Sequence, residues 1–161
     1  MYYLNYFFLY SIIGHIIETT LGYNSGILYG YWTPVYGIGV VIILFLYNKL
    51  KEKNLSDLKI GFLLFILSFL FLTIIEWIGG ILIEKIFDKV FWNYSKLPLN
   101  IGKYIAIEIS LIWGVGSLVI TFILKKYTDI VVEKIPKFIT LIFSILFVID
   151  LICTIFFKVF F

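Results

Sequence analysis

Residues 60–87 read IGFLLFILSFLFLTIIEWIGGILIEKIF, and this stretch decides the class of fold. Its charged residues are Glu76, Glu84 and Lys85. At 1.5 Å per residue, a helix of this length measures about 42 Å, whereas the hydrocarbon core of a bilayer is roughly 30 Å thick. The stretch therefore predicts a membrane-spanning helix that tilts or continues beyond the bilayer.

The composition of the whole chain points the same way. Of its 161 residues, 62% are hydrophobic and 14% are charged, and the mean hydropathy is +1.07. A soluble domain of this size has too little interior to bury so much apolar surface, but lipid can take the place of that interior. We therefore predict an integral membrane protein whose partner is the lipid bilayer, and we expect no nucleic-acid partner.

Five apolar stretches reach or approach the roughly 20 residues that a helix needs to cross the hydrocarbon core. They lie at 3–23, 32–48, 60–87, 103–124 and 137–158. The prediction is an all-α integral membrane protein, a bundle of about five transmembrane helices that forms a single transmembrane domain over residues 1–161.

The orientation follows from the lysines, which are concentrated in the links at 49–59 and 125–137. Because positively charged links stay in the cytoplasm, the N-terminus is predicted to be cytoplasmic and the C-terminus to lie outside. The expected location is the cell membrane, as a multi-pass protein of the bacterial cytoplasmic membrane.

Ionisable side chains inside a bilayer cost at least roughly 2.5 kcal/mol each at mid-depth, so each one needs an explanation. In the predicted orientation, those of the spans fall in the outer half: His15, Glu18, Glu76, Glu84, Glu108 and Asp150. Two interpretations of His15, Glu18, Glu76 and Glu108 stay open. They line an outward-facing polar site that binds a cation or relays protons, or they hydrogen-bond to the outer loops and hold the fold together.

The sequence singles out no metal, cofactor or catalytic group. One histidine with carboxylates is a poor zinc signature, because zinc sites use three or four protein ligands. Cys153 stands alone, which excludes an intrachain disulfide. No GxxxxGK[ST] loop occurs, so the chain does not bind ATP in the P-loop manner. We expect no metal and no cofactor, and an ATPase would have to be a separate subunit.

Three segments carry a family resemblance: YSIIGHIIETT at 10–20, NSGILYGYWTPVYGIG at 24–39, and WNYSKLPLNIGKYIAIEISLIWG at 92–114. Together with Glu76 they make the chain resemble the bacterial family of "putative ABC-transporter type IV" membrane proteins, the CmpB-like permeases. The outer-loop motif carried by the resemblance consists of Gly26, Gly30, Pro34, Tyr36, Gly37, Trp92, Asn93, Tyr94, Ser95, Pro98, Asn100 and Gly102. Further matching positions include Tyr10, Ser11, Gly14, Glu18, Ser110, Trp113 and Gly114.

The chain departs from the family pattern at three positions. Ser25 and Lys103 stand where the resemblance leads us to expect arginine, and Asn93 stands where it leads us to expect an acidic residue. If the family's arginines pair with its carboxylates, this chain has a different set of outer pairs.

The resemblance implies a transporter subunit of the permease type that works as a homo-oligomer or with a separate ATPase, which would dock on the links 49–59 and 125–136. Two alternatives stay open. One is a membrane-embedded enzyme that acts on a lipid or cell-envelope substrate, with His15 and Glu18 as an acid–base pair assisted by Glu76 or Glu108. The other is an accessory subunit whose outer aromatic loops bind another membrane protein.

Overall fold

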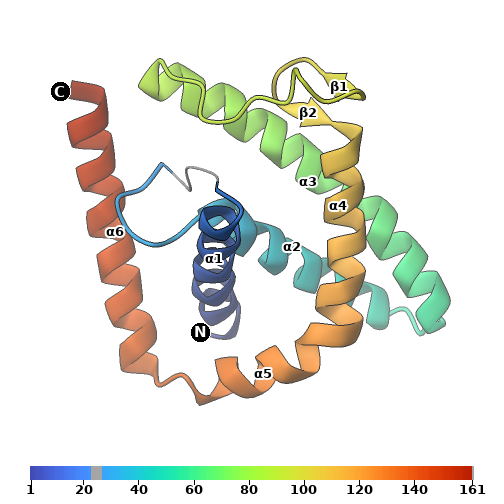
Figure 1. The fold of residues 1–161 in the computed structure, drawn as a ribbon. Coiled ribbons are helices and arrows are strands. Elements are labelled where there is room, and N and C mark those ends of the chain that lie inside the picture. The colour runs from blue at the N-terminus through green and yellow to red at the C-terminus, as the bar shows by residue number, and fades with distance from the viewer. Residues whose placement is uncertain (23–26, 161) are drawn as a thin grey trace. The chain divides into compact units, whose positions relative to one another are not determined.

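The protein is mostly helical in the computed structural model, which describes residues 1–22 and 27–160 (Figure 1). The helices are α1 (Tyr2–Thr20), α2 (Pro34–Lys51), α3 (Asp57–Phe87), α4 (Ile107–Leu118), α5 (Lys125–Lys134) and α6 (Lys137–Phe160). A π-helix, η1 (Val119–Leu124), joins α4 to α5, and two short strands, β1 (Asn100–Ile101) and β2 (Ile105–Ala106), precede α4.

Four helical stretches within the described residues are long and apolar enough to cross a membrane: Pro34–Lys51, Asp57–Phe87, Ile107–Lys134 and Lys137–Val159. They agree with the second to fifth predicted spans. Helix α1 is also 19 residues long, but Asn5, His15 and Glu18 make it more polar than the others. Its crossing of the membrane stays a prediction.

The fourth span differs from the expected 103–124 at both ends. It begins at Ile107 because the preceding residues form an antiparallel hairpin, in which Asn100 pairs with Ala106 and Ile101 with Ile105. Gly102 makes this turn possible, since its φ of +71° suits a residue without a side chain. At the other end, the helix continues through η1 and α5, and most of the link predicted at 125–136 is therefore helical.

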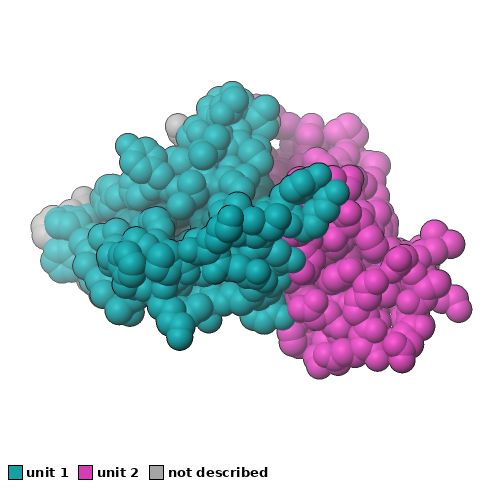
Figure 2. Space-filling model, turned by 90° about the horizontal axis from the view of Figure 1, so that it is seen from below, with its two compact units in different colours: residues 1–41, 126–161 teal, residues 42–125 magenta. Residues whose placement is uncertain are grey.

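The chain forms two compact units, which Figure 2 distinguishes by colour. Unit 1 consists of Met1–Val41 and Lys126–Phe161, and unit 2 consists of Ile42–Lys125. Unit 1 contains α1, the first part of α2, nearly all of α5, and α6. Unit 2 contains the rest of α2 together with α3, the hairpin, α4 and η1.

Polar side chains at the start of α1 fasten unit 1 together. The hydroxyls of Tyr2 and Tyr6 donate hydrogen bonds of 2.6 and 2.8 Å to Oδ1 of Asp129 on α5. The buried Asn5 donates to the carbonyl of Val132 and accepts a bond from Thr140 of α6. These bonds join three helices of the unit, and in an apolar environment they have little water to compete with.

Glycines allow α1 and α2 to approach closely in unit 1. A Cβ at Gly37 would clash with the carbonyl oxygen of Phe7 and with the hydroxyl of Ser11. A Cβ at Gly14 would clash with the ring of Tyr36. The glycines of the YSIIG and PVYGIG segments thus act in packing, as is typical of small residues between membrane helices.

Helices α3 and α4 pack side by side in unit 2 (Figure 1). Thr73 of α3 donates a 2.6 Å hydrogen bond to Ser110 of α4. Gly114, one turn further along α4, faces the ring of Phe65, which lies 2.7 Å from where a Cβ would stand. The apolar core of this unit is formed by Ile43, Leu50, Ile60, Leu64 and Leu72.

Candidate functional site

Glu76 is a buried carboxylate on α3 with 8% of its surface exposed. Its Oε1 accepts a 2.5 Å hydrogen bond from the hydroxyl of Tyr94, and its Oε2 accepts a 3.2 Å bond from the indole nitrogen of Trp113 on α4. Both donors are neutral, and the ion pairs of the described residues do not include Glu76. An ionised Glu76 is therefore hydrogen-bonded without a countercharge, and a cation or a proton would be attracted to it.

The loop that supplies Tyr94 is held in shape by its own polar groups. The side-chain oxygen of Asn93 accepts bonds from the backbone and the hydroxyl of Ser95. Asn100 donates to the carbonyls of Ser95 and Leu97, at 3.2 and 2.7 Å. These local bonds stabilise a tight turn of the kind that asparagine and serine favour. The polar residues of the WNYSKLPLN segment thus fix the loop that places Tyr94 over Glu76.

A second carboxylate of α3, Glu84, lies two turns beyond Glu76 and is paired with a cation. It forms an ion pair with Lys103 and accepts a 2.7 Å hydrogen bond from the hydroxyl of Tyr104. Burial, together with the neighbouring Glu84, raises the pKa of the Tyr104 hydroxyl to about 12, so this group stays a donor. Lys103 stands where the family resemblance leads us to expect arginine, and it does form an ion pair with a carboxylate.

The ring of Tyr104 lies against Gly80, where a Cβ would stand 2.5 Å from the ring. The indole ring of Trp92 meets the ring of Tyr104 edge-on, with the centroids 5.7 Å apart. The indole nitrogen of Trp92 is buried and has no hydrogen-bond acceptor among the described residues. Trp92 thus contributes packing to the loop beside α3.

Glu108 lies in the first turn of α4 and is partly buried. Its Oε1 accepts a 3.0 Å bond from the backbone N–H of Leu99, while its Oε2 is buried and finds no donor among the described residues. A carboxylate in the first turn is stabilised by the helix dipole. Glu76 and Glu108 thus belong to the same unit but bind different groups.

His15 and Glu18 lie on α1, in unit 1, and are both partly buried. The ring of His15 meets the ring of Tyr31 edge-on, with centroids 5.4 Å apart. The predicted four-residue set is thus divided, two residues in each unit. The sharing of one site by all four stays a prediction.

The segment Tyr29–Trp32, which precedes α2, is held by Asp150 of α6, a residue that the predicted site did not include. Its carboxylate accepts bonds from the backbone N–H groups of Tyr29 and Gly30, at 3.0 and 2.8 Å, and from the indole nitrogen of Trp32, at 2.6 Å. Thr154 donates a further bond of 3.1 Å. The signal that marks Asp150 in the sequence is its position as an aspartate within an otherwise apolar span.

The remaining residues of the outer-loop motif have structural surroundings of their own. Gly30 lies against Trp32 and Asp150, where a side chain would not fit. Pro34 is the first residue of α2, where its missing N–H costs no helical hydrogen bond. Pro98 is exposed, and Gly26 lies outside the described residues. The described residues contain no group of three or more His, Cys, Asp or Glu side chains that could hold a metal ion.

No curated protein and no solved structure matches this chain. A family model described as "Putative ABC-transporter type IV" matches residues 5–157, a range that contains every predicted site residue and the whole of α2, α3, α4 and α5, together with most of α1 and α6. The chain therefore belongs to the putative ABC-transporter type IV family.

Proposed function

We propose that this protein is a permease-type subunit of a membrane transporter, with an outward-facing polar site centred on Glu76. The observation that carries the proposal is the buried carboxylate of Glu76 between Tyr94 and Trp113, with neutral donors and no countercharge among the described residues. A charge that is costly in an apolar helix is commonly kept because it binds or moves something.

The proposed topology has five spans, with α1 as the first, the N-terminus in the cytoplasm and the C-terminus outside. Its support is the contrast between the lysine-rich links 49–59 and 125–137 and the link after α1, in which residues 23–31 carry no charge. In this orientation the loop that carries Tyr94 lies at the outer surface of the bacterial cytoplasmic membrane. His15, Glu18 and Glu108 are proposed as further polar groups of the outer side.

The permease role is tested by identifying the chains that accompany the protein when it is extracted gently from its native host. Mass spectrometry is expected to find an ATP-hydrolysing chain in a fixed ratio to this protein, and native mass spectrometry to give the number of copies per complex. The absence of any ATPase together with a retained cell-envelope precursor would contradict the permease role and would favour the enzyme alternative.

The Glu76 site is tested by thermal unfolding of the purified protein in the presence of NaCl, KCl or spermidine, with choline chloride as the control for ionic strength. A cation that binds only the folded protein raises the Tm, and the increase grows with the logarithm of the cation concentration once this exceeds the Kd. One of the three cations is expected to raise the Tm of the wild type and of the control Glu52→Gln, but not of Glu76→Gln. Glu52 is a suitable control because it is exposed and paired with Lys49.

One observation favours a second candidate function. The two oxygens of Glu76 each already accept a hydrogen bond, and the residue is largely buried. Such a carboxylate can serve to fix the outer aromatic loop, as an accessory subunit that binds another membrane protein would require. If no cation raises the Tm, and a stoichiometric membrane protein without ATPase activity co-purifies, this second function replaces the first.

A further inference from the structure

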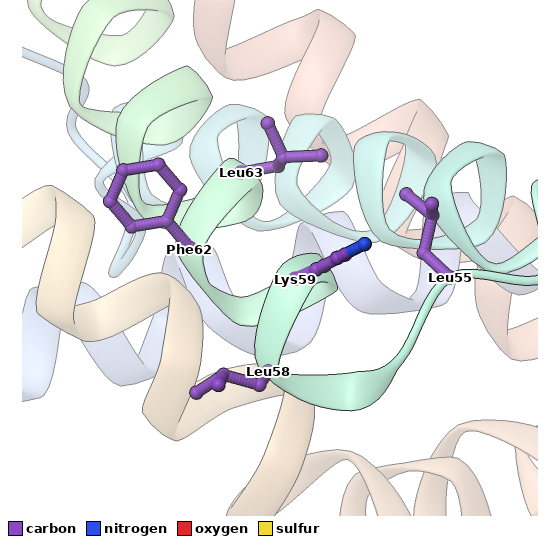
Figure 3. A pocket seen from close by; sticks show the side chains of 5 residues that line it. All are labelled: Leu55, Leu58, Lys59, Phe62 and Leu63. Atoms are coloured by element: carbon purple, nitrogen blue, oxygen red, sulfur yellow. The ribbon is translucent and has the colours of Figure 1, made fainter.

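A pocket lies at the beginning of α3, within unit 2 (Figure 3). It is lined by Leu55 of the preceding link and by Leu58, Lys59, Phe62 and Leu63 of the first turns of the helix. The wall of the pocket is apolar, because Lys59 lines it with its hydrocarbon chain and not with its ammonium group. We infer that this pocket binds an anionic phospholipid, whose phosphate lies at Lys59 and whose acyl chains lie along the leucines and Phe62.

The charges of the link leave Lys59 available for an anion. Lys49 pairs with Glu52 at 2.9 Å, and Lys51 pairs with Asp57 at 2.7 Å. Both acidic residues of the link are therefore already matched by a lysine. Lys59 is exposed and has no ion-pair partner among the described residues. An anionic headgroup would supply the missing charge.

The apolar side chains indicate a lipid as the occupant. Leu58 and Phe62 are 85% and 67% exposed, which is unfavourable in water for side chains of this size. Exposed apolar residues continue from them at intervals of four along α3: Ile66, Leu70 and Ile74. Successive residues at this spacing are neighbours on a helix, each offset from the one before by about 40°, so together they form an apolar stripe that winds around α3.

The pocket therefore opens onto a long apolar stripe of a helix that is apolar enough to cross the membrane. Acyl chains can follow such a stripe into the bilayer while the headgroup stays at its surface. An acidic segment of a water-soluble protein could contact Lys59 but could not cover the stripe. The combination of one cation and a continuous apolar face thus favours a phospholipid over a protein partner.

The test measures lipid retention by native mass spectrometry of the full chain in mild detergent, titrated with phosphatidylglycerol or phosphatidylcholine. The wild type is expected to retain phosphatidylglycerol in preference to phosphatidylcholine. Lys59→Gln is expected to weaken the retention of phosphatidylglycerol about fivefold, as the loss of one lysine near an anionic lipid implies. Lys59→Arg keeps the charge and should retain the lipid.

The matched control is Lys89→Gln, which removes the same charge at the other end of α3, where Lys89 lies over the ring of Phe91. It should leave retention unchanged, and soluble glycerol phosphate should not displace the lipid. Equal retention of the two lipids by the wild type would overturn the inference. An equal loss of phosphatidylglycerol retention in the Lys59→Gln and Lys89→Gln variants would also overturn it. The same holds if an acidic protein chain, and not a lipid, is found bound at Lys59.

Discussion

The hydroxyl of Tyr94 donates a 2.5 Å hydrogen bond to Oε1 of Glu76 and so attaches the loop between α3 and α4 to the middle of α3. Trp113 binds the other oxygen from α4, and one carboxylate thereby joins three segments of unit 2. Because Tyr94 and Trp113 reach Glu76 from different segments, a ligand that bound Glu76 would have to replace or share these bonds. Binding at this carboxylate would therefore be coupled to the position of the loop.

Tyr94→Phe removes the donor to Oε1 and keeps the aromatic ring. We expect a loss of about 1–2 kcal/mol in the free energy of unfolding, because a buried acceptor loses its partner in an apolar environment. The measurement is thermal unfolding in mild detergent, with Tyr127→Phe as the control, since Tyr127 is exposed on α5. An equal Tm for the two variants would mean that the Tyr94–Glu76 bond contributes nothing to stability.

Gly37→Ala tests the close approach of α1 and α2. The added methyl group would clash with the backbone carbonyl of Phe7, and backbone cannot move aside without shifting a helix. We expect a destabilisation of about 1–3 kcal/mol, as is typical of overpacking. Gly79→Ala is the matched control, because nothing lies within 4 Å of a Cβ there, and an alanine in a helix should be neutral or slightly stabilising. A stable Gly37→Ala variant would show that the two helices can separate at low cost.

The course of α3 could be predicted from the sequence because it depends on local properties. The apolar run at 60–87 is longer than a bilayer requires, and the observed helix contains it and adds three residues before it, from Asp57. In α4, Ser110 and Gly114 contact α3, as is typical of small residues between membrane helices. The predicted start of the fourth span, at residue 103, was wrong, because residues 103–106 continue the apolar run of the span although they belong to the hairpin. Their hairpin depends on the turn at Gly102 and on the pairing of Lys103 with Glu84.

The candidate site could be predicted only in part for a similar reason. The cost of a charge in an apolar stretch singled out Glu76, but its partners are 18 and 37 residues away in the sequence, far beyond the third and fourth neighbours that a helix brings together. Asp150 has donors that lie 118 to 121 residues earlier in the chain. Its role in holding the loop at Tyr29–Trp32 therefore depends on tertiary structure and not on local pattern.

Asp150→Asn tests that role. The variant keeps the shape of the side chain but replaces one acceptor oxygen by an NH₂ group. In one orientation of the amide this group faces the N–H groups of Gly30 and Trp32, and in the other it faces the N–H group of Tyr29. We expect the free energy of unfolding to fall by about 2–3 kcal/mol, since hydrogen bonds to a charged acceptor are lost and donors are left unpaired.

The control for Asp150→Asn is Asp88→Asn. Asp88 is exposed and has a φ of +48°, a conformation that asparagine adopts readily, so this variant should be as stable as the wild type. Thermal unfolding of the protein and limited proteolysis of the loop between α1 and α2 are the two measurements. A protease-resistant loop in Asp150→Asn would show that other contacts hold it.

The proposed topology, in which α3 crosses the bilayer with its first residue on the cytoplasmic side, predicts opposite accessibilities for the two ends of this helix. Ser56 precedes α3 next to the lysine-rich link, and Lys96 lies in the loop after it; both side chains are exposed. In a Cys153→Ser background, which removes the natural thiol of the chain, a cysteine at position 56 should react with an impermeant maleimide only after the cells are opened. A cysteine at position 96 should react in intact cells, because the helix between the two positions crosses the bilayer. Each variant serves as the control for the other. Reaction of both cysteines from the same side would mean that α3 does not cross the membrane, and an exchange of the two results would reverse the orientation, placing Glu76, Tyr94 and Trp113 toward the cytoplasm.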